Sequence, residues 1–283
     1  RARAARDKVL QRMEQVGVLT RQQMEEARQE PLPSRRRSLP FIAPHLAGRL
    51  LSAQPDTMLH RTFIDRGLQQ NLETLARQQQ SALEPYRSMA VLVVANRDRR
   101  VLAYVGASDF FDARRAGQVD MIRAIRSPGS TLKPFLYAQA IAERRLTAAS
   151  LIEDSSAQIA TSGGLYVPQN YDRQFKGWVS ARTALASSLN VPAVRTLVMV
   201  SPDAFFQELQ ALGLELRESG GYYGLSLALG SSEVTLLQLA NAYRALASGG
   251  RLSAVAPPLV RVKPPPPKWT RAVDPGAAFI VSD

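Results

Sequence analysis

Cysteine is missing from this sequence, and histidine is reduced to His45 and His60. The lack of cysteine excludes disulfides, thiolate metal sites and a cysteine nucleophile. With two histidines, a histidine-rich metal site is not expected. Long apolar runs are missing too: the longest covers residues 89–95, whereas ~20 apolar residues are needed to span a bilayer. We therefore expect that any membrane anchor lies upstream of this chain.

The composition is that of an ordinary globular protein. Of 283 residues, 45% are hydrophobic and 21% are charged, which predicts a sizeable core in one large domain or two modest ones. The net charge is +12, and residues 1–100 hold 18 basic and 10 acidic side chains. This excess is best explained by a solvated surface; the alternatives are attraction to anionic lipid, an anionic polymer or nucleic acid. No zinc-finger spacing or aromatic-interleaved RNA motif supports nucleic-acid binding.

The hydrophobic periodicity predicts strands in the first half of the chain and helices afterwards. Residues 5–30 have the pattern of a helical hairpin, in which Thr20 and Gln23 form a capping box before the second helix. The predicted strands cover residues 58–64, 89–95 and 100–105. A helix from Asp65 is expected to bury Leu68, Leu72, Leu75 and Leu83. Later helices are predicted over residues 130–145, 179–188, 191–200, 202–212 and 233–248. This order favours an α+β fold over alternating βαβ units.

Ser130 and Lys133 form the first candidate for chemistry. Pro128-Gly129 marks a helix start, which places Ser130 at the N-cap or in the first turn and Lys133 on the same face. A serine hydroxyl needs a base to become a nucleophile, and a lysine serves when burial or positive potential lowers its pKa. The free N–H groups of a helix start can also bind an oxyanion. The alternative is that Ser130 is only a cap and Lys133 is solvated.

Ser188 and Asn190 form the second candidate. They interrupt two helical patterns, so a hydroxyl and an amide could point into the same cleft. Ser188 could relay a proton between Lys133 and a leaving amine, and Asn190 could hold Lys133 or a substrate carbonyl. Taken alone, the pair is better explained as a turn.

The order S-x-x-K then S-x-N resembles the signature of penicillin-binding proteins and serine β-lactamases. Longer strings are similar to class A penicillin-binding proteins, especially the 1C type; they cover residues 126–135, 168–171, 177–190 and 229–243. Residues 62–69 resemble the start of the transpeptidase module. Residues 1–33 resemble the tail of the glycosyltransferase module. The similarity covers nearly the whole chain.

The resemblance implies a penicillin-binding, serine β-lactamase-like transpeptidase fold, in which an antiparallel sheet is flanked by helices. It divides the chain into a glycosyltransferase tail (1–33), a linker and entry segment (34–85) and a transpeptidase domain lacking its C-terminal part (86–283). The family's third motif, Lys-Thr-Gly, does not occur in the sequence. We therefore expect that the chain stops just short of this motif and that the fragment is weakly active or inactive.

The family implies D,D-transpeptidation of peptidoglycan stem peptides at the periplasmic face of the bacterial inner membrane. In this reading Ser130 is the nucleophile, which β-lactams acylate, and Lys133 is the base. Ser188 and Asn190 assist proton transfer and substrate positioning. No metal or organic cofactor is implied, and wall-assembly proteins are possible partners. Three alternatives remain open: a non-catalytic penicillin-binding or scaffold domain, a β-lactamase relative, for which no matching acidic motif stands out, and a nucleic-acid binder, whose affinity would fall steeply with salt.

Overall fold

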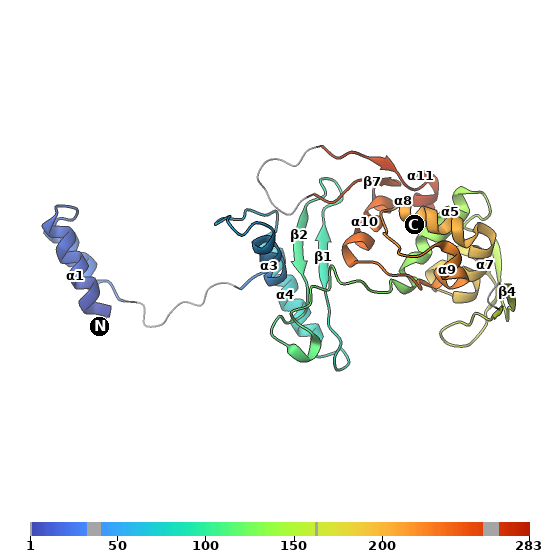
Figure 1. Cartoon of the computed structure of the whole chain (residues 1–283), viewed down its shortest axis with the longest axis horizontal. Coiled ribbons are helices and arrows are strands. Elements are labelled where there is room, and N and C mark those ends of the chain that lie inside the picture. The colour runs from blue at the N-terminus through green and yellow to red at the C-terminus, as the bar shows by residue number, and fades with distance from the viewer. Residues whose placement is uncertain (1, 33–40, 162–163, 257–265) are drawn as a thin grey trace. The chain divides into compact units, whose positions relative to one another are not determined.

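The computed structural model describes residues 2–32, 41–161, 164–256 and 266–283 (Figure 1). The chain separates into two compact units, Arg1–Phe41 and Ile42–Asp283. The first unit is the predicted helical hairpin, with helices α1 (Ala2–Gln15) and α2 (Arg21–Gln29). Its capping box is confirmed, because the Thr20 hydroxyl accepts from the Gln23 N–H and the Gln23 side chain accepts from the Thr20 N–H. The first part of the predicted linker and entry segment, residues 34–40, lies outside the described residues.

The second unit contains a β-hairpin packed between helices. Strands β1 (Val91–Val94) and β2 (Val101–Val105) pair antiparallel, as predicted. Helices α3 (Pro44–Ala53) and α4 (Arg66–Gln80) contact β2, and α10 (Leu236–Ala247) contacts β1 (Figure 1). The strand predicted at residues 58–64 is wrong: only Thr62 takes part in a single bridge. Met58 and Leu59 are exposed, so these apolar side chains do not face a core.

The buried face of α4 also differs from its prediction. Gln69, Glu73 and Ala76 are buried, whereas Leu75 is 47% exposed. The reason is hydrogen bonding: the Gln69 side chain donates to the Tyr104 carbonyl at 3.0 Å and accepts from the Tyr104 N–H at 2.7 Å. A polar side chain thus satisfies the backbone of β2 at this position, because a buried N–H or C=O group needs a partner.

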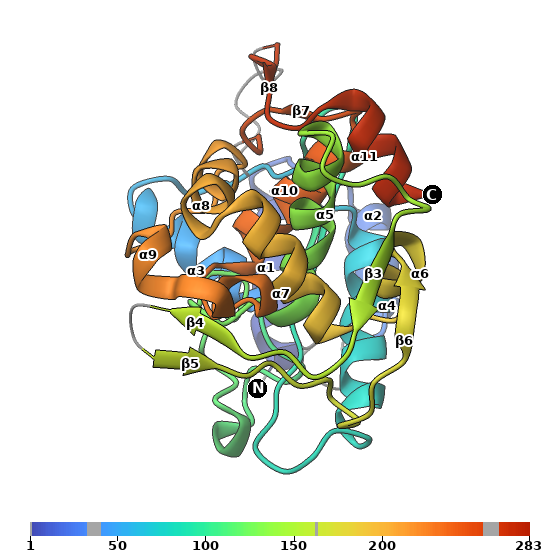
Figure 2. The ribbon, with the colours of Figure 1, turned by 90° about the vertical axis from the view of Figure 1, so that its right-hand side faces the viewer.

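The remaining elements are short strand pairs and helices. The antiparallel pairs are β3 (Leu151–Asp154) with β6 (Gly177–Ser180), β4 (Ile159–Thr161) with β5 (Gly164–Tyr166), and β7 (Arg251–Leu252) with β8 (Thr270–Arg271) (Figure 2). The α-helices are α5 (Lys133–Ala142), α6 (Ala181–Ala186), α7 (Asn190–Val200), α8 (Pro202–Ala211), α9 (Gly220–Tyr223) and α11 (Pro275–Ser282). The 3₁₀ helices are η1 (Ala113–Arg115), η2 (Gly129–Leu132) and η3 (Gly224–Leu229). The helix predicted from residue 179 begins at Ala181, because the residues before it pair with β3.

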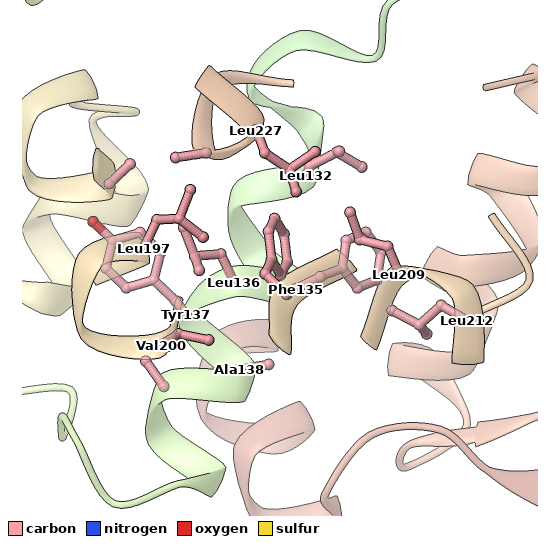
Figure 3. Packing of buried hydrophobic residues seen from close by; sticks show 14 of the residues in the cluster. Leu132, Phe135, Leu136, Tyr137, Ala138, Leu197, Val200, Leu209, Leu212 and Leu227 are labelled. Carbon is pink, nitrogen blue, oxygen red and sulfur yellow. The ribbon is translucent and has the colours of Figure 1, made fainter. Parts of the chain in front are cut away.

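Helix α5 forms the centre of the main core. Phe135, Leu136 and Tyr137 are at most 1% exposed, and the helix packs against α7, α8 and α11. Figure 3 shows Phe135 with Leu209 beside it and Leu227 above it. A helix that is buried on nearly all sides is held rigidly, and so are the residues at its start.

The architecture confirms the predicted α+β class, with helices around small antiparallel sheets. Among the described residues, β1 is hydrogen-bonded to β2 alone, and all four sheets have two strands. Every described helix falls short of the length or the hydropathy that crossing a bilayer requires.

Candidate active site

Ser130 and Lys133 lie at the junction between η2 and α5. Ser130 is in the 3₁₀ turn, and its carbonyl accepts a hydrogen bond from the Lys133 N–H. Pro134 has no N–H, so the α-helical bond to the same carbonyl cannot form. The α-helix predicted from Ser130 therefore begins at Lys133, and the residues before it form a 3₁₀ turn. Three residues apart in a 3₁₀ turn, the two side chains start from the same face.

The Lys133 side chain is buried and ends in a set of oxygen atoms. It is 1% exposed. Its Nζ donates to the Ser188 carbonyl at 2.6 Å, to Asn190 Oδ1 at 2.8 Å and to the Leu189 carbonyl at 3.2 Å, and the Ser188 Oγ is 3.3 Å away. The structure thus brings together three of the four predicted site residues, although they come from distant parts of the sequence.

Burial lowers the pKa of this amine. Removal from water disfavours the ammonium form and lowers the pKa of Lys133 to about 8, from an ordinary value of 10.5. The oxygen atoms around Nζ belong to carbonyl, amide and hydroxyl groups, which carry no net charge. They hold the amine in place without the opposite charge that would raise its pKa. A lysine with this pKa has a usable neutral fraction at pH 7.

The turn between α6 and α7 aims these oxygens at Lys133. Ser188 has φ of 53°, in the left-handed region, which a serine adopts rarely. This residue reverses the chain after α6, so the carbonyl groups of residues 188 and 189 point to the lysine. Asn190 begins α7, and its Nδ2 donates to the Gln169 carbonyl at 2.9 Å. The predicted interruption between the two helices is therefore present, and it directs the oxygens of the turn toward Lys133.

Ser130 itself stands apart from this cluster. Its side chain is exposed, and within the described part of the chain its hydroxyl makes no hydrogen bond to Lys133 or to the 188–190 turn. Its position is nevertheless fixed through the preceding backbone. Arg126 and Val234 exchange two backbone hydrogen bonds, of 2.9 and 3.0 Å, and the Ser127 hydroxyl donates to the Gly230 carbonyl at 2.7 Å.

The contact between Gly129 and Gly230 is especially close. A Cβ atom on Gly230 would lie 2.0 Å from the Gly129 carbonyl oxygen, and Gly230 has φ of 76°. Glycine is therefore required at position 230 for two independent reasons, steric space and backbone conformation. The turn that carries Ser130 rests directly on this glycine.

A polar cavity of about 600 Å³ borders the same loop. It is lined by Ser127 from the serine loop, by Tyr222 and Tyr223, and by Ser231 and Glu233, among others. Hydroxyl and carboxylate groups of this kind can bind a polar chain beside Ser127, three residues before Ser130. Among the described residues, no cluster of three or more His, Asp or Glu side chains could hold a metal ion.

Asp154 and Asn170 belong to the site and were not predicted from the sequence. The Asn170 Oδ1 accepts from the Asn190 N–H at 2.9 Å, and both oxygens of the buried Asp154 accept from the Asn170 amide at 2.8 Å. The string at residues 168–171 marked Asn170 only as part of a family likeness. Nothing in the local pattern shows that Asp154 is buried, because its partner lies 16 residues away.

Comparisons with known proteins agree with this geometry. Residues 89–282 match the family model of the penicillin-binding protein transpeptidase domain. Penicillin-binding protein 1C of Escherichia coli (strain K12) is 40% identical over 283 residues, covering 99% of this chain and 36% of that protein. Penicillin-binding protein 1A of Neisseria cinerea is 30% identical over 219 residues, covering 70% of this chain and 26% of that protein.

The fold is shared with a solved relative. The crystal structure of penicillin-binding protein 1A from Haemophilus influenzae matches 99% of this chain and 62% of its own, with a TM-score of 0.70 at 15% identity. The chain spans about a third of the length of the curated relatives named above. The family resemblance seen in the motifs is thus confirmed over most of the chain, which belongs to the penicillin-binding protein transpeptidase family.

Proposed function

We propose that this chain carries the acyl-transfer site of a peptidoglycan D,D-transpeptidase, with Ser130 as nucleophile and Lys133 as base. The observation that carries the proposal is the buried Lys133 amine, held by Ser188 and Asn190, whose pKa burial lowers to about 8. A solvated lysine beside a capping serine would have neither the burial nor these partners. The family membership supplies the substrate class, a stem peptide ending in D-alanyl-D-alanine.

The first half-reaction forms an ester. Ser130 Oγ attacks the carbonyl carbon between the two terminal D-alanines, and its proton passes to the neutral Lys133 amine. The C–N bond then breaks, and the leaving D-alanine amine takes a proton from the Lys133 ammonium through the Ser188 hydroxyl, 3.3 Å from Nζ. Free N–H groups at the start of the η2 turn are available to the developing oxyanion.

The second half-reaction reverses these proton transfers. An amine of a neighbouring stem peptide loses its proton to Lys133 and attacks the ester carbonyl. The bond to Ser130 Oγ breaks, the serine regains its proton, and a new amide joins the two stem peptides. A β-lactam takes the place of the first peptide and leaves Ser130 acylated.

Geometry explains how Lys133 can serve as the base. A neutral amine has two N–H hydrogens and one lone pair. The two short contacts, to the Ser188 carbonyl and Asn190 Oδ1, can use both hydrogens, and loss of the longer contact to the Leu189 carbonyl, at 3.2 Å, frees the lone pair. Ser130 does not contact the amine in this structure, and we propose that the contact forms when an acyl donor occupies the site, since catalytic hydrogen bonds tighten in the complex.

Labelling with a fluorescent penicillin tests the proposal. The full-length protein that contains this chain is compared with its Ser130→Ala variant, and Ser52→Ala is the control because Ser52 is exposed on α3 and its hydroxyl donates only to the Gly48 carbonyl. We expect labelling of the wild type and of Ser52→Ala, and none of Ser130→Ala. Equal labelling of Ser130→Ala, or no labelling of the folded full-length wild type, overturns the proposal.

A second assay separates an enzyme from a scaffold. If the chain only binds penicillin or recruits wall-assembly proteins, the full-length protein will be labelled but will not join stem peptides in vitro. We expect cross-linked product, and we assign the reaction to the periplasmic face of the inner membrane, where the family's substrate lies.

A further inference from the structure

The buried carboxylate of Asp154 has an unusual set of partners. Asp154 is 0% exposed at the end of β3. It accepts hydrogen bonds from the Asn170 Nδ2, at 2.8 Å to each oxygen, and from the Lys176 N–H at 2.9 Å. A buried charge is costly unless hydrogen bonds satisfy it, so Asp154 must keep these hydrogen bonds in the folded chain. An ionised carboxylate only accepts, and therefore it turns the Asn170 NH₂ group toward itself.

The opposite end of the Asn170 amide is then directed at helix α7. Its Oδ1 accepts from the Asn190 N–H at 2.9 Å and from the Val191 N–H at 3.3 Å. These are N–H groups of the first turn of α7, which have no partner within the helix. Asn170 is itself 5% exposed, so water does not replace it. The start of α7 is thus capped by a residue 20 positions earlier.

The neighbouring helices show that this arrangement is specific to α7. Helix α6 is capped by its own Ser180, and α8 is capped by its own Ser201. The N-cap of α7 is Leu189, which has no capping side chain. A local serine or aspartate would satisfy the helix start more simply. Unlike a local cap, the distant cap ties the first residue of α7 to strand β3.

We propose that Asn170, oriented by Asp154, is a positioning residue that sets the direction of Asn190 and thereby holds the Lys133 amine in its reactive place. The chain of contacts runs from Asp154 to Asn170, from Asn170 to Asn190, and from Asn190 Oδ1 to Lys133 Nζ at 2.8 Å. Asn170 touches no reacting atom. Its part in acylation depends on the proposed function, while its part in holding Lys133 does not.

Two variants break this chain at different points. Asn170→Ala removes the cap, and Asp154→Asn keeps the shape but lets the Asn170 amide turn over. The matched control is Asn241→Ala, because the Asn241 Oδ1 accepts two hydrogen bonds from the guanidinium of the buried Arg244, at 3.0 and 2.9 Å. No described contact joins Asn241 to the serine site. All three changes remove hydrogen bonds, so a general loss of stability affects the control as well.

The first readout is the titration of Lys133 in this chain, followed by NMR on ¹³C-labelled lysine. The chain has five lysines, and Lys133→Arg identifies the resonance. We expect Asn170→Ala to move the pKa of Lys133 upward by about one unit, since water reaches a loosened amine. Asp154→Asn should move it in the same direction by less, and Asn241→Ala should leave it unchanged.

The second readout is the pH profile of acylation by a fluorescent penicillin in the full-length protein. We expect an alkaline shift of the profile and about a tenfold slower acylation at pH 7 for Asn170→Ala, the rate change that a one-unit shift produces. If Lys133 titrates as in the wild type in both Asn170→Ala and Asp154→Asn, the positioning role is wrong.

The two readouts separate this inference from the proposed function. A wild type that is not acylated overturns the function, and the lysine titration still decides the positioning role. A wild type that is acylated, with an unchanged profile in the variants, overturns the positioning role alone. If Asn170→Ala does not fold, Asp154→Asn gives the decision.

Discussion

The Nζ atom of Lys133 and the Oδ1 atom of Asn190 lie 2.8 Å apart and join the start of α5 to the start of α7, across 57 positions of sequence. The acceptor is an amide oxygen, which fixes the amine without adding a negative charge. Burial therefore acts unopposed on Lys133, and its pKa falls to about 8. The uncharged nature of position 190 is as important as its location.

Replacing this amide by a carboxylate should reverse the effect. In Asn190→Asp the shape is kept, but an opposite charge near Nζ favours the ammonium and raises the pKa of Lys133. We expect acylation by a fluorescent penicillin at pH 7 to fall at least tenfold, with the profile moved to higher pH. Asn71→Asp adds the same charge on the exposed side of α4 and should behave as wild type. An unchanged profile in Asn190→Asp would remove Asn190 from the site.

The pH dependence of acylation should follow the neutral fraction of Lys133. Below pH 8 the amine is mostly protonated, so the rate should rise about tenfold per pH unit and level off above about pH 8. Lys133→Arg keeps a charge but removes the base and should slow acylation about 10²- to 10⁴-fold. Stopped-flow measurement of acylation between pH 6 and 10, in both proteins, is the check. A flat wild-type profile contradicts the role of Lys133.

The close contact between Gly129 and Gly230 gives a prediction with a matched control. Gly230→Ala introduces both a positive-φ alanine and a clash with the Gly129 carbonyl, so it should displace Ser130 and slow acylation strongly. Gly249→Ala has a similar φ of 63° but open space around the new Cβ. It should lose only ~1–2 kcal/mol of stability and keep its acylation rate. Chemical unfolding and penicillin labelling measure the two effects; equal behaviour of the variants contradicts the prediction.

Glu208 on α8 should make the stability of the fold depend on pH. Burial, and then the nearby Glu143, raise the pKa of Glu208 from 4.5 to about 7. The folded state thus binds a proton more tightly than the unfolded state, so this group lowers the free energy of unfolding as pH rises from 4.5 to 7. Glu208→Gln should be more stable than wild type at pH 8 and no more stable at pH 4.5. Denaturant titrations at pH 4.5 and pH 8 measure the free energy of unfolding of both proteins, and the exposed Glu215→Gln is the control.

The sequence predicted those features that depend on neighbouring residues. Pro128-Gly129 predicted a helix start at Ser130, and the structure has a 3₁₀ turn there, followed by α5 from Lys133, because Pro134 has no N–H to donate to the Ser130 carbonyl. The capping box of Thr20 and Gln23 was predicted for the same reason, since cap and partner are three residues apart. The strand at 58–64 was wrong, because periodicity alone does not show whether a partner strand is present.

The candidate site also combines features that the sequence predicted with features that only the folded chain shows. The amino-acid types and the order of Ser130, Lys133, Ser188 and Asn190 identified the family and the candidate residues, because a motif is a local pattern. The tertiary structure alone decided that Lys133 is buried with a lowered pKa, that Asn190 holds it, and that Asp154 and Asn170 stand behind Asn190. Desolvation and hydrogen bonds across many residues depend on which segments pack together, and no local pattern records that packing.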